Sequence, residues 1–152
     1  MDIYGVLKKD HDAVKALLET LSETGEGAVK TREKNFEKLR MELGAHSRAE
    51  EAVVYKRLAE EEETRELVLE GEEEHHLVDR LLEELAGMPV NDEQWTAKLT
   101  VLKEQVEHHV EEEEGELFKK AKKALDKDEA QSLAETFQEQ KKQHMSELKG
   151  AA

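Results

Sequence analysis

Histidine and glutamate recur in the same order in the two halves of this chain. Each half has a segment that opens with histidine, HDAVKALLETL or HHLVDRLLEEL, and then a histidine followed by a glutamate four residues later. The two opening segments agree at six positions and lie 64 residues apart, and the His-xxx-Glu pairs lie 63 residues apart. A helical bundle that joins two such halves assembles four imidazoles and two carboxylates, a donor set suited to a pair of transition-metal ions. The repeated residues are His11, His46, Glu50, His75, His109 and Glu113.

The spacing of apolar residues predicts that these six side chains point into a helical core. His11, for example, shares a stripe with Leu7 and Val14, at separations of three and four residues. An unpaired imidazole or carboxylate buried in such a stripe would be strongly destabilising. No Lys or Arg shares the stripe beside either glutamate, so a divalent or trivalent ion is the simplest source of positive charge. We therefore predict that all six residues are metal ligands.

Three further histidines are weaker candidates. His76 and His108 adjoin predicted ligands but are rotated by about 100° around their helices, away from the inward stripe. They are expected on the flank of the site, although an exchange of roles within each His-His pair stays open. His144 lies in the last helical segment and is an alternative extra ligand. A single histidine on a helix is more often a surface or core residue than a ligand.

Breakers and capping residues divide the helical pattern into five segments. Gly25 and Gly27 end the first, Gly87 and Pro89 end the third, and Asn91 or Asp92 caps the fourth. Asp126 with Glu129 resembles a capping box before the fifth. The predicted helices are residues 2–22, 29–60, 65–86, 93–124 and 127–148.

These segments predict an all-α fold. Short connections between the first four helices make neighbours antiparallel, which gives an up-down-up-down four-helix bundle with an additional C-terminal helix. We expect residues 1–124 to form the bundle and residues 125–152 to form a helix packed on it or extending from it. The composition agrees, since 40% of the 152 residues are charged, 4% are aromatic and one is proline.

Charge, hydropathy and the absence of cysteine exclude several classes of partner and ligand. A net charge of −15 would repel phosphate backbones and anionic membranes, so neither nucleic acid nor membrane is an expected partner. No apolar run approaches the roughly 20 residues that span a bilayer, and the start MDIYGVLKKDHD lacks a signal-peptide core, so a cytoplasmic protein is expected. The chain has no cysteine, which excludes thiolate ligands and iron–sulfur clusters.

The order of these motifs resembles the haemerythrin-like, HHE cation-binding domain family, over about residues 1–122. The resemblance implies a four-helix bundle that holds two iron ions in a non-haem di-iron centre, with bridging carboxylates and an oxo or hydroxo bridge. Members of the family bind O2 reversibly, sense oxygen or iron, or handle NO and peroxide. The motifs are Asp10-His11, His46 to Glu51 with Tyr55, Glu74-His75-His76, and His109 to Glu114 with Leu117-Phe118.

One departure separates the chain from the oxygen-carrying members that it resembles. Those members place a His-xxx-His pair on the third helix, whereas Asp79 stands four residues after His75 here and Arg80 four residues after His76. The four-His, two-Glu set is more similar to the subgroup with iron-sensing and iron-centre-repair proteins. Solvent, Asp79 or His144 could replace the missing ligand, and stable oxygen carriage is not expected.

Three functional classes follow from these residues. The leading one is a di-iron protein, not an enzyme, that binds O2 or NO, or senses or stores iron. The second is a di-iron peroxidase or an enzyme of NO detoxification or iron-centre repair, and the third is a metal-free helical interaction module. No Tyr or Trp is predicted beside a ligand in the inward stripe, which disfavours an oxygenase. Mn or Zn would also suit the donor set, and the sequence does not identify a redox partner.

Overall fold

The computed structural model describes residues 1–151 and shows helices throughout, with no strand among the described residues. The prediction of an all-α fold is confirmed. The elements are α1 (Ile3–Ser22), α2 (Val29–Ala49), η1 (Glu50–Tyr55), α3 (Lys56–Leu58), α4 (Glu62–Ala86), α5 (Glu93–Glu112), η2 (Glu113–Leu117), α6 (Phe118–Ala124) and α7 (Lys127–Ala151).

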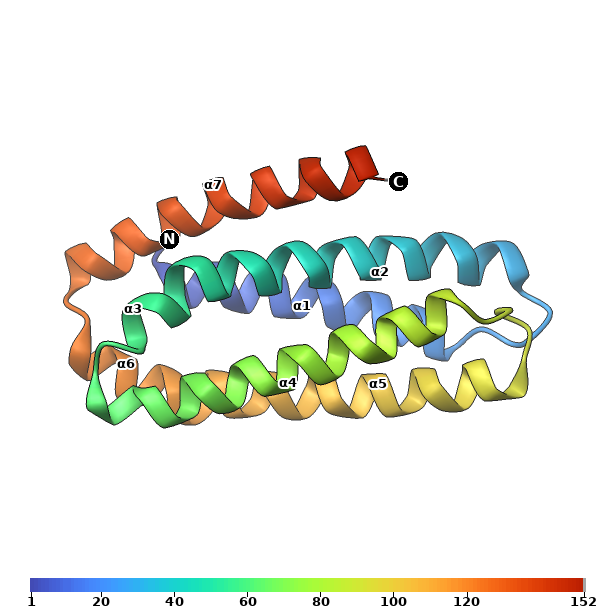
Figure 1. Ribbon diagram of the computed structural model, residues 1–152, viewed down its shortest axis with the longest axis horizontal. Coiled ribbons are helices and arrows are strands. Elements are labelled where there is room, and N and C mark those ends of the chain that lie inside the picture. Colours follow the sequence, from blue (N-terminus) through green and yellow to red (C-terminus); the bar gives the residue numbers. More distant parts are fainter. Residues whose placement is uncertain (152) are drawn as a thin grey trace.

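Four long rods run antiparallel to their chain neighbours, as Figure 1 shows. The first rod is α1, the second is α2 continued by η1 and α3, the third is α4, and the fourth is α5 continued by η2 and α6. The predicted caps are present where the chain turns: Asp92 accepts from the Gln94 amide at 2.8 Å, and Asp126 accepts from the Glu129 amide at 2.8 Å. These side chains satisfy amides that lack a partner in the first helical turn.

Two π-helical turns interrupt rods that the sequence pattern predicts as continuous α-helices. The turn η1 begins at Glu50 in the second rod, and η2 begins at Glu113 in the fourth. A periodicity of 3.6 residues per turn cannot reveal such an insertion, which is recognised only by its i→i+5 hydrogen bonds. The second rod ends at Leu58 rather than near residue 60, and α4 begins at Glu62 rather than near residue 65.

Two apolar clusters fill the bundle, one towards each end. On α1, Leu7 belongs to the cluster beside η1 and α6, and Val14 belongs to the cluster near the loops that follow α1 and α4. His11 lies between them, at 3% exposure. On α4, His75 likewise lies between Val68 and Val78 of the two clusters. A polar layer therefore crosses the middle of the bundle.

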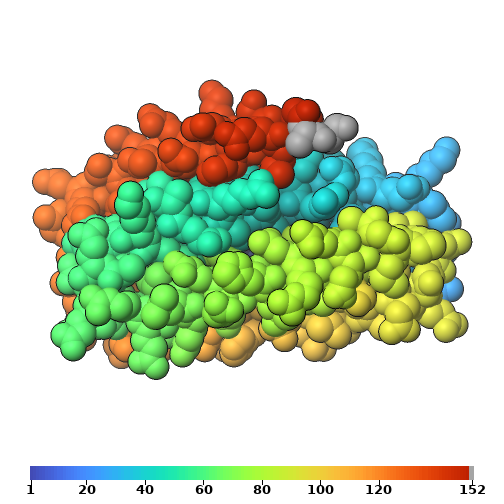
Figure 2. Space-filling view, viewed as in Figure 1, coloured from blue at the N-terminus to red at the C-terminus, as the bar shows by residue number. Residues whose placement is uncertain are grey.

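The last helix, α7, packs along the outside of α1 and α2 (Figure 1), and Figure 2 shows it lying along α2. Its Ala134 and Phe137 are fully buried in the cluster that contains η1. The Phe137 ring also meets the His46 ring edge to face, with centroids 5.5 Å apart. The fifth helix thus forms part of the surroundings of the polar layer. Among the described residues, no helix has the length and apolarity that crossing a membrane requires.

Candidate metal centre

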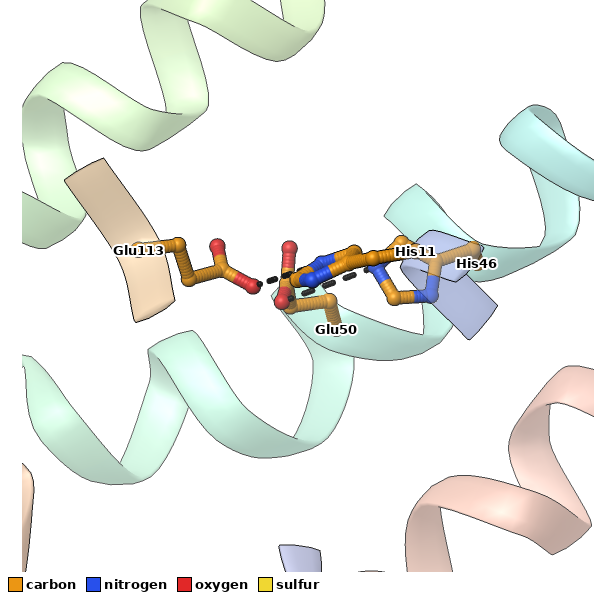
Figure 3. A group of neighbouring side chains, drawn as sticks. All are labelled: His11, His46, Glu50 and Glu113. Carbon is orange, nitrogen blue, oxygen red and sulfur yellow. Dashed lines mark ion pairs between the residues drawn. The ribbon is translucent and has the colours of Figure 1, made fainter. Parts of the chain in front are cut away.

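Four imidazoles, one from each rod, converge on two glutamates at the centre of the bundle. His11 lies on α1, His46 on α2, His75 on α4 and His109 on α5. All four are buried, as are Glu50 at 0% exposure and Glu113 at 2%. Each glutamate is the first residue of a π-helical turn. Figure 3 shows His11, His46, Glu50 and Glu113 pointing towards one another.

The two oxygens of Glu50 face different pairs of imidazoles. Its Oε2 lies 3.7 Å from His46 Nε2, while its Oε1 lies 3.1 Å from His75 Nε2 and 4.0 Å from His109 Nε2. Glu113 is placed in the same manner, with Oε1 3.3 Å from His11 Nε2 and Oε2 3.2 Å from His109 Nε2. Each carboxylate therefore lies between the His11–His46 pair and the His75–His109 pair.

An outer carboxylate accepts a hydrogen bond from Nδ1 of each imidazole, and in every case it comes from another element. Asp10 accepts from His46 at 2.8 Å, and Glu51 accepts from His75 at 3.0 Å. In the other two pairs, Glu74 accepts from His109 at 2.7 Å and Glu114 accepts from His11 at 2.7 Å. These bonds fix the rings so that Nε2 faces the glutamates, as is common for imidazoles that ligate metals.

The buried atoms at the centre fit a cation. Within the described part of the chain, His11 Nε2, His46 Nε2, Glu113 Oε1 and both oxygens of Glu50 have no hydrogen-bond partner. Buried polar atoms without partners are rare, and a metal ion would satisfy all of them together. Two overlapping groups of candidate ligands share Glu50: His11, His46, Glu50 and Glu113 form one, and Glu50, His75 and His109 form the other. Nitrogen and oxygen donors of this kind suit Fe, Mn or Zn.

Without a cation, neighbouring carboxylates raise the pKa of three of the imidazoles. Burial by itself would lower the pKa of His46, but the charge of Glu50 and the hydrogen bond to Asp10 outweigh burial and raise the pKa to about 10. Burial is likewise outweighed by neighbouring carboxylates at His75 and His109, where the pKa is also raised. The centre therefore attracts positive charge, which bound metal ions would supply in place of protons.

Tyr55 lies at the centre, although the sequence names it only as part of the family motif and not as a site residue. Its hydroxyl donates to Glu113 Oε2 at 2.8 Å and lies 3.5 Å from His109 Nε2. Its ring stacks on His75, with centroids 5.2 Å apart. The expectation that no Tyr stands beside a candidate ligand is wrong. In a regular α-helix, Tyr55 would be rotated by about 140° from Glu50. The π turn instead brings Tyr55 to the same side as Glu50. The pairing of each glutamate with an aromatic five residues later was the available signal.

The weaker candidates lie outside the two central groups. His76 and His108 are exposed, and His76 faces Glu73 at 3.7 Å. His144, on α7, faces Glu147 at 3.4 Å, and Asp79 is an exposed residue of α4. Among residues 1–151, the structure thus brings together the six predicted ligands and joins neither Asp79 nor His144 to them.

This chain belongs to a family of cation-binding helical domains. Residues 2–121 match the model of the Hemerythrin HHE cation binding domain, which confirms the family that the motifs predicted. The fold is similar to that of an HHE cation-binding domain-containing protein from Mycobacterium kansasii, known from a crystal structure. The TM-score is 0.85 at 24% identity, and the similarity covers 97% of this chain and 89% of that one.

Two relatives are similar in sequence. One is an uncharacterised hemerythrin-like protein of Schizosaccharomyces pombe, 29% identical over 136 residues, which covers 88% of this chain and 66% of that protein. The other is a DNA nickase of a Nostoc species, 28% identical over 155 residues, which covers all of this chain and 42% of that protein. The chain thus spans less than two thirds of the length of either relative.

Proposed function

We propose that this protein holds two iron ions between its four histidines and binds a small diatomic ligand, O2 or NO, at that centre. The observation that carries the proposal is the placement of Glu50 and Glu113, each with one oxygen towards the His11–His46 pair and the other towards the His75–His109 pair. A carboxylate in that position is suited to bridge two ions. Bound ferrous iron would supply the electrons and the open coordination positions that binding O2 or NO requires.

A small cavity beside the imidazoles supports a diatomic ligand. It has a volume of about 20 Å³ and is bordered by all four histidines, together with Ser47 and apolar side chains from four helices. A cavity needs roughly 10–15 Å³ to hold one water-sized molecule, so this one suits a ligand of two or three atoms. Its apolar walls favour an uncharged ligand over a hydrated anion. The apolar residues are Val14, Leu43, Val78, Val106 and Val110.

Tyr55 favours a second candidate function, a peroxidase or NO-handling oxidoreductase. Its buried hydroxyl donates to Glu113 and lies beside His109, so a proton donor is already in place at the centre. Burial, with the charges of Glu113 and Glu50, raises the pKa of Tyr55 well above its ordinary value, which keeps the phenol protonated. A protonated phenol can donate a hydrogen bond to a reacting oxygen atom.

Optical spectroscopy of the iron-loaded protein tests the proposal and separates the two functions. We expect the ferrous protein to change its absorption on adding O2 or NO, and to recover the original spectrum when the gas is removed. Steady turnover of hydrogen peroxide, at a rate lowered in Tyr55→Phe, would instead establish the enzyme. If the ferrous protein responds to none of the three, the proposed function is wrong.

We further infer that the partners of this chain are small molecules rather than nucleic acid. The net charge of −15 opposes contact with phosphate backbones, and the Nostoc nickase extends well beyond the part that matches. In a plasmid assay at low ionic strength, the metal-loaded chain is expected neither to shift nor to nick supercoiled DNA. Salt-sensitive binding or nicking would overturn this inference.

A further inference from the structure

A second group of metal-type side chains lies at the surface beside the centre. Glu74 comes from α4, and His108 and Glu112 come from α5; one ligand atom of each lies within 4.8 Å of the others. His108 Nε2 is 3.7 Å from Glu74 Oε2 and 3.5 Å from Glu112 Oε2. His108 and Glu112 repeat the four-residue spacing of the central His-xxx-Glu pairs.

Glu74 joins this surface group to the centre. Its Oε2 faces His108, while its Oε1 accepts from Nδ1 of His109 at 2.7 Å. His109 in turn directs Nε2 towards Glu113 at 3.2 Å. One carboxylate thus separates an exposed group of donors from a buried one.

A narrow crevice follows the same path from the surface inwards. Glu70, Glu74 and Glu112 line it together with Tyr55, His109 and Glu113. The first three are at least partly exposed, and the last three are buried. At its inner end, Glu113 is 2% exposed and belongs to the central group with His11, His46 and Glu50. The crevice therefore has an acidic mouth and leads to residues of the centre.

We propose that Glu74, His108 and Glu112 capture a divalent transition-metal cation and pass it along this crevice to the central ligands. One imidazole and two carboxylates match the donor preference of Fe²⁺, Mn²⁺ or Zn²⁺. Glu70 adds a further negative charge at the mouth, and a cleft lined by one sign of charge raises the local concentration of the opposite ion. The inference rests on the proposed metal centre, because it assigns the path by which that centre is loaded.

Cobalt uptake by the metal-free protein tests the path. Co²⁺ is the probe, since its visible absorption reports binding without any turnover. The test variant combines His108→Asn with Glu112→Gln, and the matched control combines His76→Asn with Glu73→Gln. His76 and His108 are similarly exposed, at 59% and 61%, and each faces a glutamate. At low ionic strength we expect the test variant to load about tenfold more slowly, with the same final spectrum, and the control to load at the wild-type rate.

A second measurement tests the capture site independently of the centre. Substoichiometric Mn²⁺ is added, and the broadening of the histidine ring resonances is followed by NMR. We expect broadening of His108 before His76. Equal loading rates in all three proteins, or a similar slowing in the control, would overturn the path, and equal broadening of the two rings would overturn the site. If wild-type protein gains no central cobalt band while His108 is still broadened, the proposed central function fails and the surface site stands.

Discussion

The candidate ligands and the residues that orient them are neighbours in the sequence but belong to different pairs in space. Asp10 precedes His11, yet it accepts from His46; Glu51 follows Glu50, yet it accepts from His75. Every imidazole is thereby tied to an element other than its own. A shift of one rod would break hydrogen bonds of two rings, so the arrangement couples the positions of the ligands to the packing of the bundle.

Tyr55→Phe is expected to weaken the metal-free fold. The change removes the donor to Glu113 Oε2, a buried carboxylate oxygen, and losing such a partner costs about 1–3 kcal/mol. Urea unfolding of chelated protein measures the difference.

Tyr4→Phe provides the matched control for Tyr55→Phe. The Tyr4 hydroxyl has a buried oxygen with no hydrogen-bond partner within residues 1–151, so its removal is expected to leave the free energy of unfolding unchanged or higher. Equal losses in the two variants would show that the bond from Tyr55 to Glu113 contributes nothing specific.

At the residue scale, what the sequence could predict depends on local pattern. The six central residues were recognisable because each places a polar group in an apolar stripe, and the structure brings all six together. Glu51 and Glu74 could not be assigned, because their partners His75 and His109 lie on other helices and no periodicity states which helices meet. Their position beside a predicted ligand in each half of the repeat was the only sign.

At the scale of elements, the two π turns set the geometry of the centre. Both begin at a central glutamate, and an aromatic residue stands five positions later: Tyr55, the last residue of η1, and Phe118, the first residue of α6. Tyr55 reaches Glu113 of the opposite half, whereas Phe118 has no hydroxyl and packs on Tyr4 with centroids 5.1 Å apart. The two halves thus match in their candidate ligands, whereas only the first contributes a hydroxyl donor.

Gly71→Ala is expected to destabilise the protein by about 1–3 kcal/mol, as overpacking of a close contact does. A Cβ at Gly71 on α4 would lie 2.5 Å from the Tyr55 hydroxyl oxygen and 2.9 Å from Cζ, so the ring that stacks on His75 would have to move. Thermal and urea unfolding measure the cost.

Gly115→Ala is the control for Gly71→Ala. Gly115 also lies in a helical segment, but a Cβ there would have no heavy-atom neighbour within 4 Å. Replacing a helical glycine in open space is expected to raise stability by up to about 1 kcal/mol. A neutral Gly71→Ala would mean that α4 and η1 can separate without loss.

The sequence predicts the helix ends and the topology, but it does not predict the two π turns that interrupt the rods. Asp92, Asp126 and the Gly87–Pro89 segment mark boundaries through local chemistry, so the elements that they bound were predicted to within a few residues. No capping or helix-breaking residue marks the π turns in the sequence. The first π turn brings Glu50 and Tyr55, five residues apart, to the same side, where Tyr55 meets residues of other rods.

At the scale of the whole molecule, a polar layer divides the hydrophobic core into two clusters. This layer buries carboxylates in a chain whose net charge is already −15. Metal binding to the folded state alone stabilises by mass action, so chelation is expected to lower the melting temperature.

The effect of chelation should also depend on pH. In the metal-free protein the pKa of His46 is raised from 6.5 to about 10. The stability that protonated His46 contributes is complete below pH 6.5 and is lost as the pH rises through about 10. Metal ligation requires neutral imidazoles, so this loss is confined to the chelated protein. We expect the gap between zinc-loaded and chelated melting temperatures to widen from pH 6.5 to 9.5. A gap that is constant or narrows over that range would contradict this assignment.

Counting the metal ions tests the central claim most directly. After anaerobic ferrous loading and removal of free iron, native mass spectrometry of the wild-type chain is expected to show two iron ions. Glu50→Ala and Glu113→Ala, each checked for helical content, are expected to lose both ions together, because each carboxylate lies between the two imidazole pairs. A wild-type chain with one ion or none, or a folded variant that keeps one ion at full occupancy, would contradict a carboxylate-bridged pair of ions at this centre.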